Sequence, residues 1–147
     1  MTTAAPGGQR EILVFIYDAK MSGLSDSAHL AGARLLGEVA TEPRFDLIDM
    51  GTHVALAPGG SVSVRGELYA VEPKHLARLD VENAPRLLRR SRVRLDDGRE
   101  VEAHMLESDQ VRGRRRIRSG DYRAQLAPSA PVRQAGAWSQ WARGRRR

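Results

Sequence analysis

The chain has 147 residues, 41% of them hydrophobic, which fits one domain with a packed core. It contains no cysteine, and this excludes disulfides, thiolate catalysis and cysteine-ligated metal centres. The net charge of +6 is uneven, because residues 112–147 hold eleven arginines and one acidic residue while the preceding part is mildly acidic.

The arginine-rich end has the charge to bind nucleic acid or an acidic partner. It has few aromatic side chains on which bases could stack, so a solvated basic end is the favoured interpretation and nucleic acid is not an expected partner. No apolar run reaches the roughly 20 residues of a membrane helix, and the start lacks the pattern of a signal peptide. We therefore expect a cytoplasmic protein without a membrane partner.

The first element is an apolar run at 11–17, which predicts a buried central strand after a disordered leader at 1–10. It stops at a short polar loop, 18–23, whose backbone N–H groups would lie at one end of a sheet and can meet a ligand. Helix-capping residues then precede 28–33, which predicts a short helix or helical turn.

Strands are predicted next at 34–40, 44–50, 54–57 and 61–71, joined by short turns. The last of these changes its alternation at Gly66, which indicates a bulge or a close backbone approach. Pro73 opens a helix that ends around Asp80 to Asn83, with Leu76, Leu79 and Val81 as its buried stripe.

Two more strands, 87–95 and 100–106, flank an Asp-Asp-Gly turn that predicts an antiparallel hairpin. Periodicity is lost from Glu107 onward. Strands outnumber helices and short turns join them, so we expect an α+β fold: a small mixed β-barrel or sheet with one or two packed helices. The domain is expected at 11–126, followed by a basic C-terminal tail at 127–147.

The sequence carries no pattern for a metal or a cofactor. The histidines at 29, 53, 75 and 104 stand in separate segments, so they predict no metal site and are interpreted as surface or edge residues. No serine lies in a Gly-x-Ser-x-Gly context, and Gly59-Gly60 lacks the Lys-Ser/Thr of a phosphate loop. Hydrolysis by a serine nucleophile and nucleotide binding are therefore not expected.

Glu82 is a candidate for acid–base chemistry, because it stands where the predicted helix ends. A carboxylate there meets the negative end of the helix dipole, and partial burial would favour its protonated form further, as a general base requires. From composition alone, a residue that only solvates the turn is the favoured interpretation of Glu82. Asp80 is the other candidate, and it too can be an ordinary residue of the last helical turn.

The order of several short motifs resembles the gamma-glutamylcyclotransferase-like family over about residues 11 to 123. The motifs are a first strand that ends in Tyr17 before a loop with Gly23, and then 30–38, 43–47, the Pro58-Gly-Gly turn, 64–69, Leu79-Asp80 with Glu82, 85–90 and 119–123. Each motif is weak, but eight in the same order are fairly specific. The resemblance implies a small mixed barrel with a cavity at one end.

The resemblance also implies a reaction, the release of 5-oxoproline from gamma-glutamyl amides, including gamma-glutamyl peptides and gamma-glutamylated antibiotic intermediates. A glutamate of the family's Leu-Asp-x-x-Glu-Gly segment moves the proton, and counting back from Pro85 places it at Glu82. The family's Tyr-Gly-Ser/Thr-Leu loop supplies backbone donors. The corresponding substrate-binding residues here are Tyr17, Asp18, Ala19, Lys20, Met21 and Gly23.

The loop departs from the family pattern. Asp18 replaces its glycine, which would cost any positive-φ conformation needed there, and Lys20 can neutralise Asp18 or bind a carboxylate itself. The spacing from Asp80 to Glu82 is also one residue short. Three hypotheses remain: a cyclotransferase with an altered substrate, a related amide-cleaving or cyclising enzyme of secondary metabolism, or a non-catalytic ligand- or partner-binding relative. We favour an enzyme acting on an amine- or gamma-glutamyl-bearing small molecule; a homodimer stays open.

Overall fold

A computed structural model describes residues 11–126, and the predicted leader at 1–10 and the predicted basic tail at 127–147 lie outside this range. Its strands form one mixed sheet in the order β2-β5-β1-β7-β4-β3-β8, and β6 adds to β7. The strands are β1 (Ile12–Ile16), β2 (Arg34–Ala40), β3 (Phe45–Asp49), β4 (Val54–Pro58), β5 (Arg65–Val71), β6 (Leu88–Arg94), β7 (Glu100–Leu106) and β8 (Arg115–Arg116).

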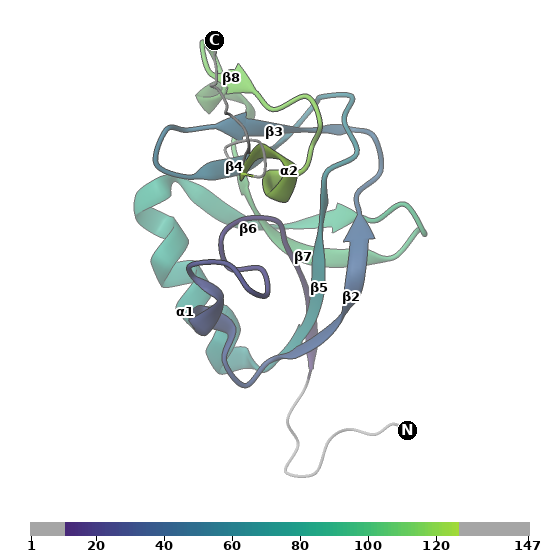
Figure 1. The fold of residues 1–147 in the computed structure, drawn as a ribbon, viewed down its shortest axis with the longest axis vertical. Coiled ribbons are helices and arrows are strands. Elements are labelled where there is room, and N and C mark those ends of the chain that lie inside the picture. The colour runs from purple at the N-terminus through teal and green to yellow at the C-terminus, as the bar shows by residue number, and fades with distance from the viewer. Residues whose placement is uncertain (1–10, 127–147) are drawn as a thin grey trace, which may run out of the picture.

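The sheet bends into a half-barrel, in which β2 and β5 run across the direction of β3 and β4 (Figure 1). The first strand is central as predicted: β1 pairs antiparallel with β5 and parallel with β7, and β4 is also parallel to β7. The remaining pairs are antiparallel, including the predicted hairpin of β6 and β7. The α+β mixed fold expected from the sequence is therefore confirmed.

One main helix, α1 (Pro73–Asn83), packs on the sheet through Leu76 and Leu79, which lie in a cluster with apolar side chains of β1 and β5. Reciprocal contacts between Glu72 and His75 cap its first turn. The prediction that Val81 belongs to the buried face of this helix was wrong, because Val81 is 73% exposed. The remaining helices are short: η2 (Ser27–Leu30), η3 (Ala84–Arg86), η4 (Ser108–Gln110) and α2 (Tyr122–Leu126).

Gly66 allows a close backbone approach, one of the two predicted explanations for its place in β5. A Cβ at this position would overlap the carbonyl oxygen of Ile16 and touch the Phe15 ring. The register shift lies instead in the neighbouring strand, between Leu35 and Gly37 of β2. The absence of a side chain at Gly66 thus lets β5 lie against the end of β1, just before the loop at 18–23.

Two short elements were not predicted, and one expectation from the sequence was wrong. The segment after Glu107 contains β8 and α2, although its sequence shows no periodicity. The histidines are not all surface or edge residues, because His75 and His104 are each 5% exposed. Within the described range, no helix is long and apolar enough to cross a membrane.

Candidate functional site

The loop that follows β1 is a chain of tight turns. The N–H of Met21 donates to the Asp18 carbonyl at 3.0 Å, and the N–H of Asp26 donates to the Ala19 carbonyl at 2.9 Å. Gly23 has a φ of 78°, while Asp18 is not among the residues with positive φ. The expected backbone cost of aspartate in place of the family's glycine is therefore not present at this position.

Asp18 and Lys20 form a buried ion pair at the start of the loop. Asp18 is 8% exposed and Lys20 is 3% exposed. The Lys20 ammonium lies 3.0 Å from one carboxylate oxygen of Asp18, and the Lys20 backbone N–H donates to the other at 3.1 Å. Of the two roles predicted for Lys20, the structure shows the neutralisation of Asp18. Only one of the three ammonium donors engages a described residue.

Tyr17 anchors the entrance to the loop. Its hydroxyl donates to the His104 carbonyl at 2.7 Å, and the His104 ring contacts Asp80 at 2.8 Å. Burial, with a smaller contribution from the charge of Asp18, raises the pKa of the Tyr17 hydroxyl far above its ordinary value. Burial also lowers the pKa of His104, against the opposing effect of Asp80. Tyr17 is thus a neutral structural donor at physiological pH.

The far end of the loop is held by Glu67 of β5. One Glu67 oxygen accepts the Ser22 N–H at 2.7 Å and the Tyr69 hydroxyl at 2.9 Å; the other accepts the Ser22 hydroxyl at 2.6 Å and the Arg123 guanidinium at 3.0 Å. Burial alone would raise the pKa of Glu67, but these hydrogen bonds and the charge of Arg123 hold it below its ordinary value. Glu67 is therefore ionised and fully partnered.

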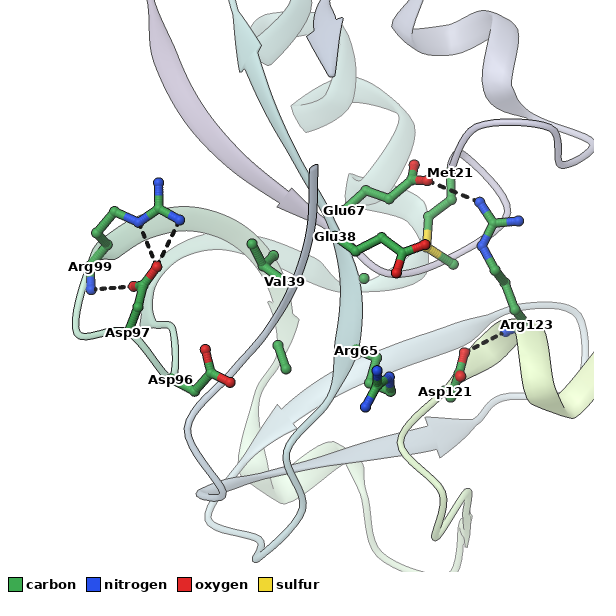
Figure 2. A pocket seen from close by; sticks show the side chains of 12 residues that line it. Met21, Glu38, Val39, Arg65, Glu67, Asp96, Asp97, Arg99, Asp121 and Arg123 are labelled. Atoms are coloured by element: carbon green, nitrogen blue, oxygen red, sulfur yellow. Dashed lines mark hydrogen bonds and ion pairs between the residues drawn. The ribbon is translucent and has the colours of Figure 1, made fainter. Parts of the chain in front are cut away.

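A pocket of about 420 Å³ opens beside this cluster, between β2, β5, the β6–β7 turn and the start of α2. Figure 2 shows its charged side chains, with Glu67 and Arg123 directed at each other. Asp97 and Arg99 form a second pair on its rim. Four of its charged side chains have no ion-pair partner among the described residues: Glu38, Arg65, Asp96 and Asp121. The Asp121 carboxylate accepts the backbone N–H groups of Arg123 and Ala124 instead.

Met21 lines this pocket, and it is the only one of the predicted substrate-binding residues of the described loop to do so. Tyr17, Asp18 and Lys20 are buried and do not line it. No group of three or more histidine, aspartate or glutamate side chains within residues 11–126 is arranged to hold a metal ion.

Glu82 lies in the last turn of α1, outside the 420 Å³ pocket. Its Oε1 is 2.9 Å from Nδ1 of His29, a residue of η2, and the two side chains are 28% and 40% exposed. The distance is that of an ion pair, yet the angles do not make a hydrogen bond. Both atoms are buried and have no hydrogen-bond partner in the described part of the chain.

The structure does not join Glu82 to the loop directly: no hydrogen bond or ion pair within residues 11–126 connects it to residues 17–23. The two are linked through η2, because the backbone N–H of Asp26, which precedes this helix, donates to the Ala19 carbonyl. Asn83, the next residue after Glu82, is 3% exposed and donates to the Leu79 carbonyl at 2.9 Å. Counted forward from Leu79-Asp80, the family's glutamate position would fall on Asn83.

Sequence reasoning missed the partners of the loop. Glu67 and Arg123 lie 56 positions apart and were not assigned a role, and neither was His29. The available signal was the pair of motifs at 64–69 and 119–123, which carry Glu67, Tyr69 and Arg123. These motifs indicated a family, and the structure shows that they meet in one cluster.

Comparisons with known proteins bear on the family and on the fold of the chain. The family model described as gamma-glutamyl cyclotransferase, AIG2-like, matches residues 14–124. A protein of Vibrio cholerae serotype O1 named "Putative gamma-glutamylcyclotransferase" is 38% identical over 82 residues, which are 55% of this chain and 70% of that protein.

Two solved structures are similar in fold. The Escherichia coli protein c4763 superposes with a TM-score of 0.71 at 23% identity, over 80% of this chain and 96% of that chain. An AIG2-like protein from Mus musculus has a TM-score of 0.65 at 20% identity, over 76% of this chain and 89% of that chain. At these identities the two structures bear on the fold alone.

Proposed function

Because the chain belongs to the gamma-glutamyl cyclotransferase, AIG2-like family, we propose that it cleaves a gamma-glutamyl amide by intramolecular amine attack, with Glu82 as general acid and base. The products would be 5-oxoproline and the free amine.

One observation carries the role of Glu82. Its Oε1 is the only carboxylate oxygen of the described residues that is buried and lacks a hydrogen-bond donor. Apart from the contact with His29, no donor of the described residues engages either oxygen of this carboxylate, so an acceptor is left to take a proton from a substrate amine. Glu67, the one buried glutamate of the described residues, has all its acceptor sites occupied and its pKa is lowered, so it is poorly suited to that task.

The proposed reaction needs no other co-reactant. The α-amine nitrogen attacks the γ-carbonyl carbon, a C–N bond forms, and Glu82 takes the amine proton. The tetrahedral intermediate then collapses, the original amide C–N bond breaks, and Glu82 returns the proton to the leaving amine. Because the attack is intramolecular, the enzyme contributes mainly by folding the substrate and stabilising the oxyanion.

The loop leaves few donors for that oxyanion. The N–H groups of Lys20, Met21 and Ser22 are occupied by Asp18 and Glu67. The N–H groups of Ala19 and Gly23 have no partner within the described chain, so we assign the oxyanion contact to Ala19, which is also bonded to the segment before His29.

The pocket beside Met21 is proposed to hold the charged end of the substrate. Its free carboxylates, Glu38 and Asp96, suit an ammonium group, and Arg65 suits a carboxylate. A gamma-glutamyl amine with a second amino group carries both signs. A place in secondary metabolism, a cytoplasmic location and a homodimer remain parts of this proposal.

The test is a panel of gamma-glutamyl amines, containing gamma-glutamyl peptides and a gamma-glutamylated aminoglycoside, with 5-oxoproline as the measured product. Glu82→Gln should lower kcat by about a hundredfold or more, since positioned proton transfer contributes about 10²–10⁴-fold. Glu100→Gln, an exposed acid on β7, is the matched control and should keep wild-type turnover.

The panel also separates the alternatives. If the wild type and Glu82→Gln release 5-oxoproline at the same rate, Glu82 is not the acid–base group. If the wild type releases none from any member while the panel still binds, the cyclotransferase proposal fails in favour of the ligand-binding relative.

A further inference from the structure

Among the described residues, His29 is the one whose side chain makes an ion-pair contact with Glu82. Its Nδ1 lies 2.9 Å from Oε1 of Glu82, and both atoms are buried without a hydrogen bond to any described residue. Two acceptors at this distance would repel, so the contact is favourable only when a proton lies on Nδ1 or on the carboxylate.

We propose that His29 is the positioning residue for Glu82: with a proton on Nδ1, its imidazole holds the carboxylate in one orientation toward the incoming substrate amine. This inference rests on the proposed function for its catalytic consequence, while the contact itself can be tested without turnover.

The backbone around His29 is well fixed, which suits a positioning role. Its N–H donates to the Asp26 carbonyl at 3.0 Å, and the neighbouring Leu30 is 4% exposed in the cluster that also contains Leu76 and Leu79 of α1. The imidazole is therefore carried by a segment that is packed against the same helix as Glu82. A group held in this way can restrict the rotamers of its partner.

The same segment is tied to the substrate loop. Asp26 donates its N–H to the Ala19 carbonyl at 2.9 Å, and the N–H of Leu24 donates to the Met21 carbonyl at 3.1 Å. Through these hydrogen bonds, the segment that carries His29 fixes the Glu82 carboxylate relative to Ala19, the proposed oxyanion donor. The acid–base group and the oxyanion contact would keep a constant separation, as an intramolecular attack requires.

His75 provides a matched control on the same helix. Its ring contacts the Ala31 carbonyl at 3.1 Å, so it also joins α1 to the segment after the loop, but at the other end of the helix. A variant of His75 loosens the packing of the segment without removing a contact to Glu82.

The kinetic test compares three variants on the best substrate of the panel. His29→Ala should lower kcat by about tenfold while KM changes less than about twofold, because the change removes orientation of the acid–base group. His29→Asn should keep kcat within about threefold, since its amide nitrogen can donate from nearly the place of Nδ1. His75→Asn should have the same kcat as the wild type. Equal kcat for His29→Ala and wild type, or an equal loss in His75→Asn, would overturn the proposal.

A second measurement does not need turnover. Long-range ¹⁵N–¹H correlation spectra show which ring nitrogen carries the proton, and we expect protonated Nδ1 in the wild type at neutral pH. Glu82→Gln should change this state, because the charge that favours it is gone. The same His29 tautomer in both proteins overturns the inference even if the enzyme is active, and a silent panel with the expected spectra counts against the proposed function alone.

Discussion

The two ends of the loop after β1 each bury a carboxylate against a cation, but they do so in different ways. At the start, Asp18 and Lys20 are two residues apart and pair only with each other. At the far end, Glu67 accepts from Tyr69 on its own strand and from Ser22 and Arg123, which are distant in the sequence. The first centre, the Asp18–Lys20 pair, is local and isolated. The second centre, Glu67 with its donors, connects three separate parts of the chain.

The two centres also differ in how far their charged side chains are exposed to solvent, which indicates different roles. Both Lys20 and Asp18 are almost completely shielded, with 4% and 11% of their side chains exposed, so neither can lose its partner without leaving a buried charge. Arg123 is 39% exposed, and solvent can support it when Glu67 changes. We interpret the first centre as the element that shapes the substrate loop and the second as the anchor of the loop to β5 and α2.

The largest effect is expected at the isolated pair. Asp18→Asn should reduce the free energy of unfolding by about 3 kcal/mol, because a buried charge left without its partner costs about 3–5 kcal/mol and the long lysine side chain recovers part of this by moving outward. Chemical denaturation measures the change. The double variant Asp18→Gly with Lys20→Leu restores the residues typical of the family and should lie closer to wild type than Asp18→Asn. A double variant less stable than Asp18→Asn would show that the pair is not isolated.

A smaller effect is expected at the anchor. Glu67→Gln keeps the shape of the side chain and part of its hydrogen bonding to Ser22, but it removes the charge that faces the partly exposed Arg123. The free energy of unfolding should therefore fall by about 2 kcal/mol. Because the folded pKa of Glu67 lies below its ordinary value, its stabilisation is present above that value and is lost as the pH falls through the folded pKa.

The pH dependence checks this assignment. The difference in unfolding free energy between wild type and Glu67→Gln should be constant near pH 7 and should shrink below the ordinary carboxylate pKa. Glu38→Gln is the control, since Glu38 is exposed and has no ion-pair partner among the described residues. A difference that does not depend on pH would mean that the charge of Glu67 contributes nothing to the anchor.

The elements with clear periodicity could be predicted from sequence, and the reasons are local. The strand at 44–50 was placed because its residues alternate between polar and apolar, and the helix from Pro73 because a first-turn proline and an apolar stripe agree. Val81 was misplaced because the stripe was read from apolarity alone, and the helix turns that side chain outward. β8 and α2 were missed because tertiary contacts rather than local preference fix these short elements.

The candidate site was predictable only where partners are near in sequence. The Asp18–Lys20 pair follows from two charges two residues apart, and its neutralisation was one of the expected outcomes. The contacts of Glu67 with Ser22 and Arg123 span 45 and 56 positions, and no local pattern announces them. The contact of His29 with Glu82 likewise depends on how η2 lies on the end of α1.

The smallest effect is expected in the pocket beside Glu67 and Arg123, and it concerns substrate binding. Glu38→Gln should leave the unfolding free energy within about 0.5 kcal/mol of wild type, as for most surface substitutions. If an ammonium group of the substrate meets Glu38, KM should rise by up to about fivefold with kcat unchanged, since an exposed ion pair is worth up to about 1 kcal/mol. Asp97→Asn, whose carboxylate is already paired with Arg99 on the rim, should leave KM unchanged. Steady-state kinetics at low ionic strength make the comparison, and an equal rise in both variants would assign the effect to the general field of the pocket rather than to a contact at Glu38.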